Sequence, residues 1–285
     1  MAGIDPASLT REDLAKLIRK ILDDRIHGIS FSPYVAGQGP GTRIAAGQIA
    51  NRLDLIRANT DWIRTFSCSE GNELIPATAK ANGLKTLVGV WLDDDKERNE
   101  MELANAGVIA QAGHADILGV GNEVLLRGEL TEDELLSYIQ RAKEMAPNTP
   151  VAYVDAYFKF NDHPRIADAC DVILANCYPF WESCPAEHAL LYMKEMYRQA
   201  QKAAKGKKVI VSETGWPNIG TAEGGALPSD LNAMKYFIDT YRWAEEEGIE
   251  IFWFSAFDEA WKVADEGDVG AYWGLWDSDG HPKYC

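Results

Sequence analysis

Two glutamates stand where short apolar segments of the chain end. Glu123 follows the apolar segment 116–120, and Glu213 follows the run Val-Ile-Val at 209–211. Such segments are typical of short buried strands. Burying a carboxylate without a partner is costly, so each glutamate is expected to have a partner or a chemical task. Two facing carboxyl groups can break a glycosidic bond, because a protonated one donates to the leaving oxygen while an ionised one attacks the anomeric carbon.

Polar and aromatic residues accompany these two glutamates. Side chains that could bond to hydroxyl groups end other apolar segments: Tyr34, Arg64, Asn122, Asn176, Tyr178 and Glu259. Large aromatic rings stand nearby in the chain, among them Phe180, Trp181 and Trp216. Sugar rings stack their apolar faces on aromatic rings, and their hydroxyls bond to amide, carboxylate and guanidinium groups. The sequence therefore favours a carbohydrate ligand.

The elements that must position these residues alternate regularly along the chain. Eight apolar segments are predicted to be strands: 27–34, 62–68, 86–92, 116–120, 151–157, 172–178, the apolar part of 207–217, and 249–257. Segments with helical periodicity separate them, and a further helix is predicted over 8–24, capped by Thr10 and Asp13. Eight strands joined by helices predict an α/β fold, a closed (β/α)8 TIM barrel with an extra N-terminal helix. We expect one catalytic domain over 1–285, with the barrel over about 27–283.

The barrel prediction places the two glutamates relative to each other. In such a barrel, residues at the carboxyl ends of the strands meet at one mouth. The fourth and seventh strands lie across that mouth from each other, so Glu123 and Glu213 are predicted to face one another. An ionised Glu213 would then raise the pKa of Glu123 and keep it protonated for proton donation. Trp253 and Phe254 are expected to belong to the core.

Composition limits the classes of partner. The chain has 285 residues, of which 46% are apolar, and a net charge of -16. This charge disfavours nucleic acid and anionic membranes, and a neutral substrate fits it. The sequence has no apolar run of about 18 residues that would suggest a membrane span. Residues 1–25 are too charged for a signal peptide, and the compartment stays open.

Several other motifs are assigned to structure rather than to a cofactor. The glycines at 37, 39 and 41 fit a dinucleotide-binding loop poorly, because the third is misplaced. Asp93, Asp94 and Asp95 are more typical of a helix cap than of a metal loop. The five histidines have no ligand spacing, and the five cysteines, without any CxxC, favour a reduced set over a disulfide framework. No metal and no cofactor are expected.

The motifs around the two glutamates carry a family resemblance. Gly121-Asn122-Glu123 and Ser212-Glu213-Thr214-Gly215-Trp216-Pro217 resemble glycoside hydrolase family 17, the β-1,3-glucanase family. The similarity extends over residues 28–283 and includes four further motifs: Ile63-Arg64-Thr65-Phe66, Asn176-Cys177-Tyr178-Pro179-Phe180-Trp181, Phe257-Asp258-Glu259-Ala260-Trp261-Lys262 and Trp273-Gly274-Leu275. The segments 31–34 and 178–181 look more like the bacterial branch than the plant one. Plant members tend to carry an acidic residue where this chain has Gly270, so the chain departs from the plant pattern in that loop.

The resemblance implies roles for individual residues. It implies a retaining enzyme with Glu123 as general acid/base and Glu213 as nucleophile. Asn122 would bond the sugar 2-hydroxyl or the nucleophile, and Arg64 would lie beneath Glu213. Tyr178 would hold a sugar or the nucleophile. Two further residues, Glu259 and Lys262, would hold substrate hydroxyls.

The resemblance leaves several activities open. The leading expectation is an endo-acting β-1,3-glucanase, and the alternative is a β-1,3-glucanosyltransferase that passes the same covalent intermediate to a sugar acceptor. A barrel acting on β-1,4-linked glucan or mannan and a non-catalytic glucan-binding barrel are less favoured, since both glutamates are present. For a retaining enzyme, the carboxyl groups should lie about 5–5.5 Å apart. We expect a monomer acting on β-1,3-glucan or laminari-oligosaccharides, and the resemblance suggests a secreted or periplasmic protein.

Overall fold

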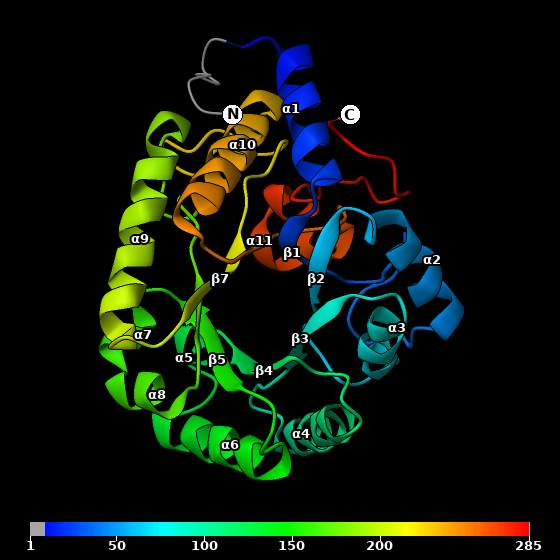
Figure 1. The fold of residues 1–285 in the computed structure, drawn as a ribbon, viewed down its shortest axis with the longest axis vertical. Helices are drawn as coiled ribbons and strands as arrows, with labels where there is room; N and C mark the ends of the chain where they lie inside the picture. The colour runs from blue at the N-terminus through cyan, green and yellow to red at the C-terminus, as the bar shows by residue number, and fades with distance from the viewer. Residues whose placement is uncertain (1–8, 285) are drawn as a thin grey trace.

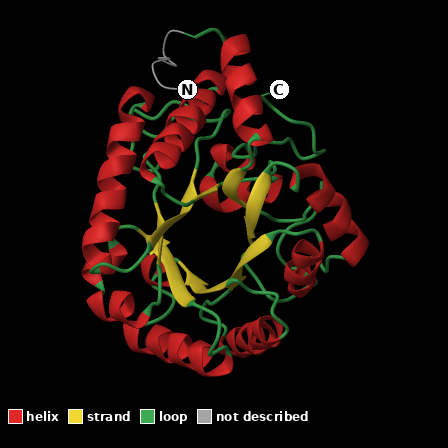
Figure 2. Ribbon diagram, viewed as in Figure 1, coloured by secondary structure: helices red, strands yellow, loops and turns green. Residues whose placement is uncertain are grey.

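The strands form a closed barrel in which each pairs with its sequence neighbours and the last pairs with the first (Figures 1 and 2). This computed structural model describes residues 9–284. The strands are parallel: β1(Ile26–Ser30), β2(Thr60–Arg64), β3(Lys85–Val90), β4(Ile117–Asn122), β5(Val151–Ala156), β6(Ile173–Asn176), β7(Val209–Thr214) and β8(Ile251–Trp253). The prediction of a (β/α)8 barrel is confirmed.

Helices surround the barrel and connect its strands (Figure 2). The α-helices are α1(Arg11–Asp23), α2(Ala46–Ile56), α3(Ile75–Ala81), α4(Lys96–Gln111), α5(Val124–Arg127), α6(Glu132–Met145), α7(Lys159–Asp162), α8(Pro164–Ala169), α9(Ala189–Ala204), α10(Asp230–Glu247) and α11(Val263–Glu266). Short 3₁₀ helices are η2(Asn72–Leu74), η3(Ala186–His188), η4(Ala260–Lys262) and η5(Asp268–Ala271). The helix predicted over 8–24 is α1, and residue 8 lies outside the described residues. Thr10 caps it by accepting a hydrogen bond from the Asp13 backbone N–H, as expected.

The last strand is shorter than the predicted segment 249–257. After Trp253 the backbone N–H groups of Phe254 and Ala256 still donate to Thr214 and Ser30, the last residues of β7 and β1, but the chain also bonds to the segment 273–276. Ser255 N–H donates to the Trp273 carbonyl, and Trp276 N–H donates to the Ala256 carbonyl. The chain therefore leaves the barrel early and forms part of the mouth.

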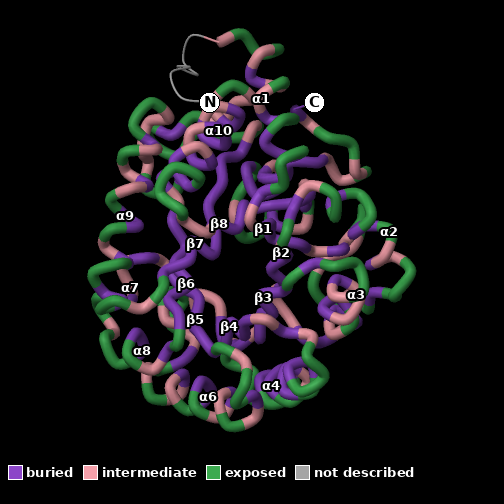
Figure 3. The backbone as a smooth tube through the Cα atoms, in the orientation of Figure 1, coloured by how far each residue is buried: buried purple, intermediate pink, exposed green. Residues whose placement is uncertain are grey.

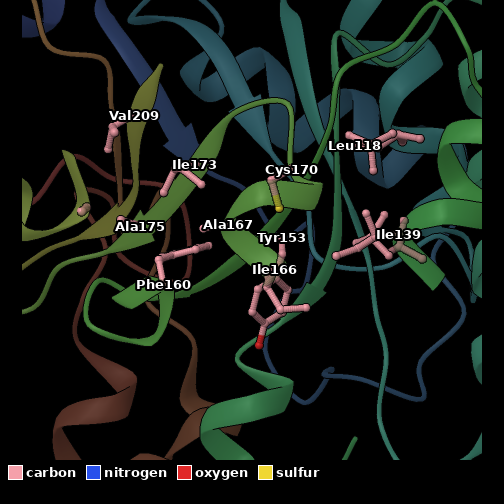
Figure 4. Close-up of a cluster of buried hydrophobic side chains, with 14 of the residues drawn as sticks. Leu118, Ile139, Tyr153, Phe160, Ile166, Ala167, Cys170, Ile173, Ala175 and Val209 are labelled. Atoms are coloured by element: carbon pink, nitrogen blue, oxygen red, sulfur yellow. The ribbon is translucent and has the colours of Figure 1, made fainter. Parts of the chain in front are cut away.

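Apolar side chains fill the space inside the barrel and the space between strands and helices. Most of the strand backbone is buried, whereas the outer helix faces are exposed (Figure 3). Inside, Leu174, Ile210 and Phe252 belong to a compact cluster with Leu87 and Val154. Outside, the cluster in Figure 4 joins strand and helix side chains, among them Ile173 and Val209 with Phe160, Ile166 and Cys170.

Trp253 and Phe254 are both buried, as expected for core residues. Trp253 packs against Phe237 and Tyr241 of α10. Helix α1 lies along α10 (Figure 1), and Leu14 and Ile18 of α1 are completely buried. The N-terminal helix therefore packs on the outside of the barrel against α10.

The amino-terminal end of the barrel is closed by aromatic rings. His27 stacks on Trp62 with 5.6 Å between ring centroids, and the Phe252 ring meets both edge-on. Gly28 allows this packing, because a Cβ atom there would lie 2.4 Å from the Phe252 ring. The floor of the barrel therefore requires glycine at this position.

A buried carboxylate ties together the loops that follow β2 and β3. Glu102 of α4 is fully buried and accepts hydrogen bonds from the backbone N–H groups of Cys68, at 2.6 Å, and Trp91, at 3.1 Å. The hydroxyls of Ser67 and Ser69 also donate to it. This charge is therefore compensated by hydrogen bonds that fix two loops near the mouth.

The remaining motif predictions can be compared with the structure. Asp95 caps α4 by accepting hydrogen bonds from the Glu97 and Arg98 backbone N–H groups, so the helix-cap assignment is confirmed. Cys68, Cys170, Cys177 and Cys184 carry free thiols, and Cys285 lies outside the described residues. Over residues 9–284, no cluster of three or more His, Cys, Asp or Glu side chains is arranged to hold a metal ion. Within the same range, no helix has both the length and the apolar character needed to cross a membrane.

Candidate active site

A cavity of about 360 Å³ opens at the carboxyl ends of the strands, and both glutamates line it. Its lining residues come from the ends of β4 to β8 and the loops that follow: Glu123, Leu126, Ala156, Tyr157, Phe158, Asn176, Tyr178, Trp181, Glu182, Glu213, Phe254 and Glu266. The strand ends are irregular here, since the β4–β5, β6–β7 and β7–β8 pairings all shift register near the mouth. Such irregularities turn side chains out of the regular alternation and into the cavity.

Glu213, in β7, is held by a donor on each carboxyl oxygen. Arg64 at the end of β2 donates from Nη1 to Glu213 Oε1, and the Tyr178 hydroxyl donates to Oε2 at 2.6 Å. Arg64 is itself fixed, because its Nη2 donates to Asn122 Oδ1 at 2.7 Å and its guanidinium lies 4.4 Å above the Phe66 ring centroid. Both donors stabilise negative charge on the carboxylate and fix its orientation.

Glu123 occupies a backbone conformation that is unusual for a residue with a side chain. Its φ of 55° lies in the left-handed region, directly after β4 and before α5. Its backbone N–H donates to the Val154 carbonyl at 2.8 Å, and Arg127 bonds back to the Asn122 carbonyl. A strained backbone of this kind costs about 1–3 kcal/mol and persists only where surrounding contacts enforce it. Here it directs the carboxyl group into the cavity.

Within residues 9–284, the Glu123 carboxyl accepts a hydrogen bond from one side chain, that of Asn176. Asn176 Nδ2 donates to Glu123 Oε1 at 2.8 Å, and Ser212 Oγ donates to Asn176 Oδ1 at 2.8 Å, which fixes the orientation of the amide. Desolvation by the surrounding protein and, next, the charge of Glu213 raise the pKa of Glu123 to about 7. The expected influence of Glu213 is confirmed, although burial is the larger cause. The two carboxyl groups therefore differ: Glu213 accepts hydrogen bonds from Arg64 and Tyr178, whereas burial and the charge of Glu213 raise the pKa of Glu123.

The aromatic residues divide into an exposed group and a buried group. Trp181 keeps 38% of its surface exposed and lines the cavity. Phe180 and Trp216, both expected to contact a sugar, are instead 0% and 1% exposed. They pack edge to face at 5.3 Å, and Trp216 Nε1 donates to the Leu227 carbonyl at 3.0 Å. In this structure both support the wall behind Trp181 and do not line the cavity.

Glu259 and Lys262 form a buried pair beside the cavity. Lys262 Nζ lies 2.7 Å from Glu259 Oε2 and 3.7 Å from the centroid of the Phe254 ring, which lines the cavity. Trp261 Nε1 donates to the other Glu259 oxygen at 3.2 Å. Tyr34 packs edge-on against Trp261 with 6.0 Å between centroids. Tyr34, Glu259 and Lys262 thus form a neighbouring group outside the cavity lining.

Some lining residues had no signal in the sequence. Leu126, Tyr157, Phe158, Glu182 and Glu266 follow β4, β5, β6 and β8 in loops or short helices, where no periodic pattern shows which way a side chain points. Glu182 follows Trp181, and Tyr157 is the last residue of the segment 151–157 that was predicted to be a strand, so position in the chain was the available clue. Glu266 lies seven positions after Glu259, on the short helix α11.

Two unequal carboxyl groups at the mouth of a (β/α)8 barrel, with an exposed tryptophan beside them, define a class: the barrel glycoside hydrolases. Comparison with known proteins is consistent with that class. The BtgE/BtgC glycoside hydrolase domain family matches residues 28–274, and the chain belongs to it. This confirms the resemblance to glycoside hydrolase family 17.

Individual relatives support the same assignment. The chain is 31% identical over 258 residues to "Glucan 1,3-beta-glucosidase BGL2" of Candida albicans, covering 81% of this chain and 83% of the relative. It is 29% identical over 252 residues to a "Glucan 1,3-beta-glucosidase" of Arthroderma benhamiae, covering 81% and 82%. The solved structure of a glycoside hydrolase family 17 beta-1,3-glucanosyltransferase from Rhizomucor miehei superimposes with a TM-score of 0.82 at 29% identity, covering 92% of this chain and 96% of that one. These relatives are fungal and give no support to placement in a bacterial branch.

Proposed function

We propose that this chain is a retaining glycoside hydrolase that cleaves β-1,3-glucan, with Glu213 as nucleophile and Glu123 as general acid/base. The observation that carries the proposal is the inequality of the two carboxyl groups. Glu213 is held by Arg64 and Tyr178, which stabilise its charge, whereas burial and the neighbouring charge raise the pKa of Glu123 to about 7. A nucleophile must be ionised and an acid protonated at the same pH, and the donors to Glu213 together with the raised pKa of Glu123 favour these two roles.

The proposed reaction has two steps. In the first, Glu213 attacks the anomeric carbon while Glu123 gives its proton to the glycosidic oxygen, so the carbon–oxygen bond breaks and the leaving sugar departs with a hydroxyl group. The sugar is then bound to Glu213 as an ester. In the second step, Glu123, now ionised, removes a proton from water as the water oxygen attacks the same carbon and releases Glu213. Asn176 bonds to Glu123 and keeps it directed towards the scissile bond.

The second candidate function is β-1,3-glucanosyl transfer, in which a sugar hydroxyl replaces water in the second step. The observation that favours it is the apolar wall made by Leu126, Tyr157, Phe158 and Trp181. These residues follow β4, β5 and β6, on the side of Glu123, where the leaving sugar departs and an acceptor sugar would bind. An acceptor sugar held on this wall would lie close to the anomeric carbon and would react with it in place of water.

Product analysis with a laminari-oligosaccharide such as laminaripentaose tests both candidates. Shorter products with retained anomeric configuration, followed by NMR, are expected for the hydrolase, and products longer than the substrate would establish transfer. Inverted products, or activity confined to β-1,4-linked glucan or mannan, would refute the proposal. Glu213→Gln should abolish turnover, while Glu187→Gln, an equivalent change at an exposed position, should leave it intact. Turnover retained by Glu213→Gln would refute the nucleophile assignment, and binding without turnover by the unaltered protein would indicate a non-catalytic barrel.

The proposal extends to the whole chain as one catalytic unit that acts as a monomer. Its 44 acidic residues against 28 basic ones favour a neutral glucan over nucleic acid as the partner. Size-exclusion chromatography with light scattering should give a mass near 31.6 kDa, and a dimer would contradict the monomer proposal.

A further inference from the structure

A third carboxylate lines the cavity and has no part in the two-step reaction. Glu266 is the last residue of α11, the short helix in the loop after β8 (Figure 1), and it lines the same cavity as Glu123 and Glu213. Among residues 9–284, no side chain or backbone group forms a hydrogen bond or ion pair with its carboxylate. Its oxygens are therefore available to a ligand in the cavity.

The order of the strands places Glu266 on the side of the nucleophile. Glu266 follows β8, which pairs with β7, the strand that carries Glu213. Glu123 follows β4, which pairs with β3 and β5. Since Glu123 must face the bond to the leaving sugar, the sugar that Glu213 attacks, called here the donor sugar, lies on the side of Glu266.

The nearest cation does not neutralise Glu266 by direct contact. Lys262 Nζ pairs with Glu259 Oε2 at 2.7 Å and lies over the Phe254 ring. Glu259 is also occupied by the Trp261 indole N–H. Of the two carboxylates beside Lys262, Glu259 is therefore occupied, and Glu266 remains able to accept new hydrogen bonds.

The backbone of this loop explains why the carboxylate comes from position 266. A Cβ atom at Gly270 would lie 2.8 Å from both Glu266 Cβ and the Lys262 carbonyl oxygen. Such contacts are shorter than packed atoms tolerate, so Gly270 must remain without a side chain in this loop conformation. The packing of Gly270 against Glu266 instead fixes the position of α11 beside the cavity.

We propose that Glu266 determines specificity for the donor sugar: its carboxylate accepts hydrogen bonds from hydroxyl groups of that sugar, and its negative charge disfavours a donor sugar that carries a carboxylate. This inference rests on the proposed function. A neutral glucosyl unit offers O–H donors to the carboxylate, whereas a uronic acid unit would bring a second negative charge within a few ångströms of it and of Glu213.

The ionisation of Glu266 gives the proposal a pH signature. Burial raises its pKa to about 7; Lys262 lowers it, and the charges of Glu213, Glu259 and Asp265 raise it further. The negative charge therefore develops as the pH rises through about 7. Discrimination against anionic donor sugars should be weak at about pH 5 and strong at about pH 8.

The experiment compares laminaritetraose with the same oligosaccharide oxidised at C6 to uronic acid units. The oxidised compound is used as a competitive inhibitor of laminaritetraose cleavage. Its inhibition constant Ki can therefore be measured whether or not the enzyme cleaves the oxidised compound itself. At about pH 8, Glu266→Gln should lower Ki at least about tenfold, with little change at about pH 5. On unmodified laminaritetraose at neutral pH, Glu266→Ala should lower kcat/KM about ten- to a hundredfold, the loss expected for hydrogen bonds to a charged acceptor. Melting temperatures of all variants establish that they are folded.

Asp265→Asn is the matched control, because it removes an exposed neighbouring charge on the same helix. It should change Ki less than about twofold, since exposed charges are screened by solvent. Equal effects of Asp265→Asn and Glu266→Gln, or a Glu266→Gln effect that is the same at both pH values, would overturn the charge-based proposal. Unchanged kcat/KM in Glu266→Ala would overturn the hydrogen bonds to the donor sugar. Inactivity of the unaltered protein on laminarin would instead overturn the proposed function.

Discussion

The pKa of Glu123 offers a direct test of how the site works. Glu213→Gln removes the second-largest cause of the raised pKa and leaves the largest, burial, in place. The difference between a pKa of about 7 and the ordinary 4.5 corresponds to about 3 kcal/mol in favour of the protonated carboxyl. We therefore expect the pKa of Glu123 to fall in Glu213→Gln but to stay above its ordinary value.

The measurement is a ¹³C NMR titration of labelled glutamate carboxyls, with the Glu123 resonance assigned by its disappearance in Glu123→Gln. NMR is needed because Glu213→Gln is expected to be inactive. In the unaltered protein the basic limb of the kcat/KM profile should lie near pH 7, because Glu123, the proposed general acid, loses its proton there. An unchanged Glu123 pKa in Glu213→Gln would refute electrostatic coupling between the two groups. A return to 4.5 would refute burial as the leading cause.

Three further predictions concern stability and products. The folded protein holds the Glu123 proton up to about pH 7 and the unfolded chain releases it near 4.5, so stability falls as pH rises between these values. Glu123→Gln should therefore raise the free energy of unfolding by up to about 3 kcal/mol at pH 8 and leave it unchanged at pH 4. Urea titration measures both values. In the same titration, Phe180→Ala should lower the free energy of unfolding by about 3–5 kcal/mol, because its ring is buried. Trp181→Ala should lower it by less than half as much and should alter the product ratio with laminari-oligosaccharides. Equal stability losses would contradict the buried and exposed assignments. Glu102→Ala should lower stability by at least about 2 kcal/mol, because the Cys68 and Trp91 N–H groups lose their acceptor, and a smaller loss would mean that water replaces the carboxylate.

The fold could be predicted from the sequence because it depends on periodic patterns. Short β-branched runs such as 209–211 alternate with helical spacing, and the number of such pairs determines a closed barrel. The two glutamates could be found for the same reason, since each follows a recognisable strand. The segment 249–257 was harder, because its second half has strand-like composition but pairs with a loop segment.

The rest of the site depends on the direction in which loop side chains point. Loops have no periodic sequence pattern from which this direction could be predicted. Phe180 and Trp181 are adjacent aromatics, yet one is buried and the other exposed. Trp216 has a motif that suggests a sugar contact, but its indole N–H bonds to the Leu227 carbonyl inside the fold. Glu266 lies in a helix of four residues whose orientation depends on the contact with Gly270.

The aromatic floor of the barrel determines how substrate enters the cavity and how products leave it. With His27, Trp62 and Phe252 packed at the far end, the cavity has its entrance and its exit at the same opening. A glucan chain must therefore lie across the mouth and cannot thread through the barrel. The departing fragment, the incoming water and any second sugar must all use this one opening. In the proposed mechanism, the time that the first product stays there therefore determines how often the covalent intermediate meets water or a second sugar.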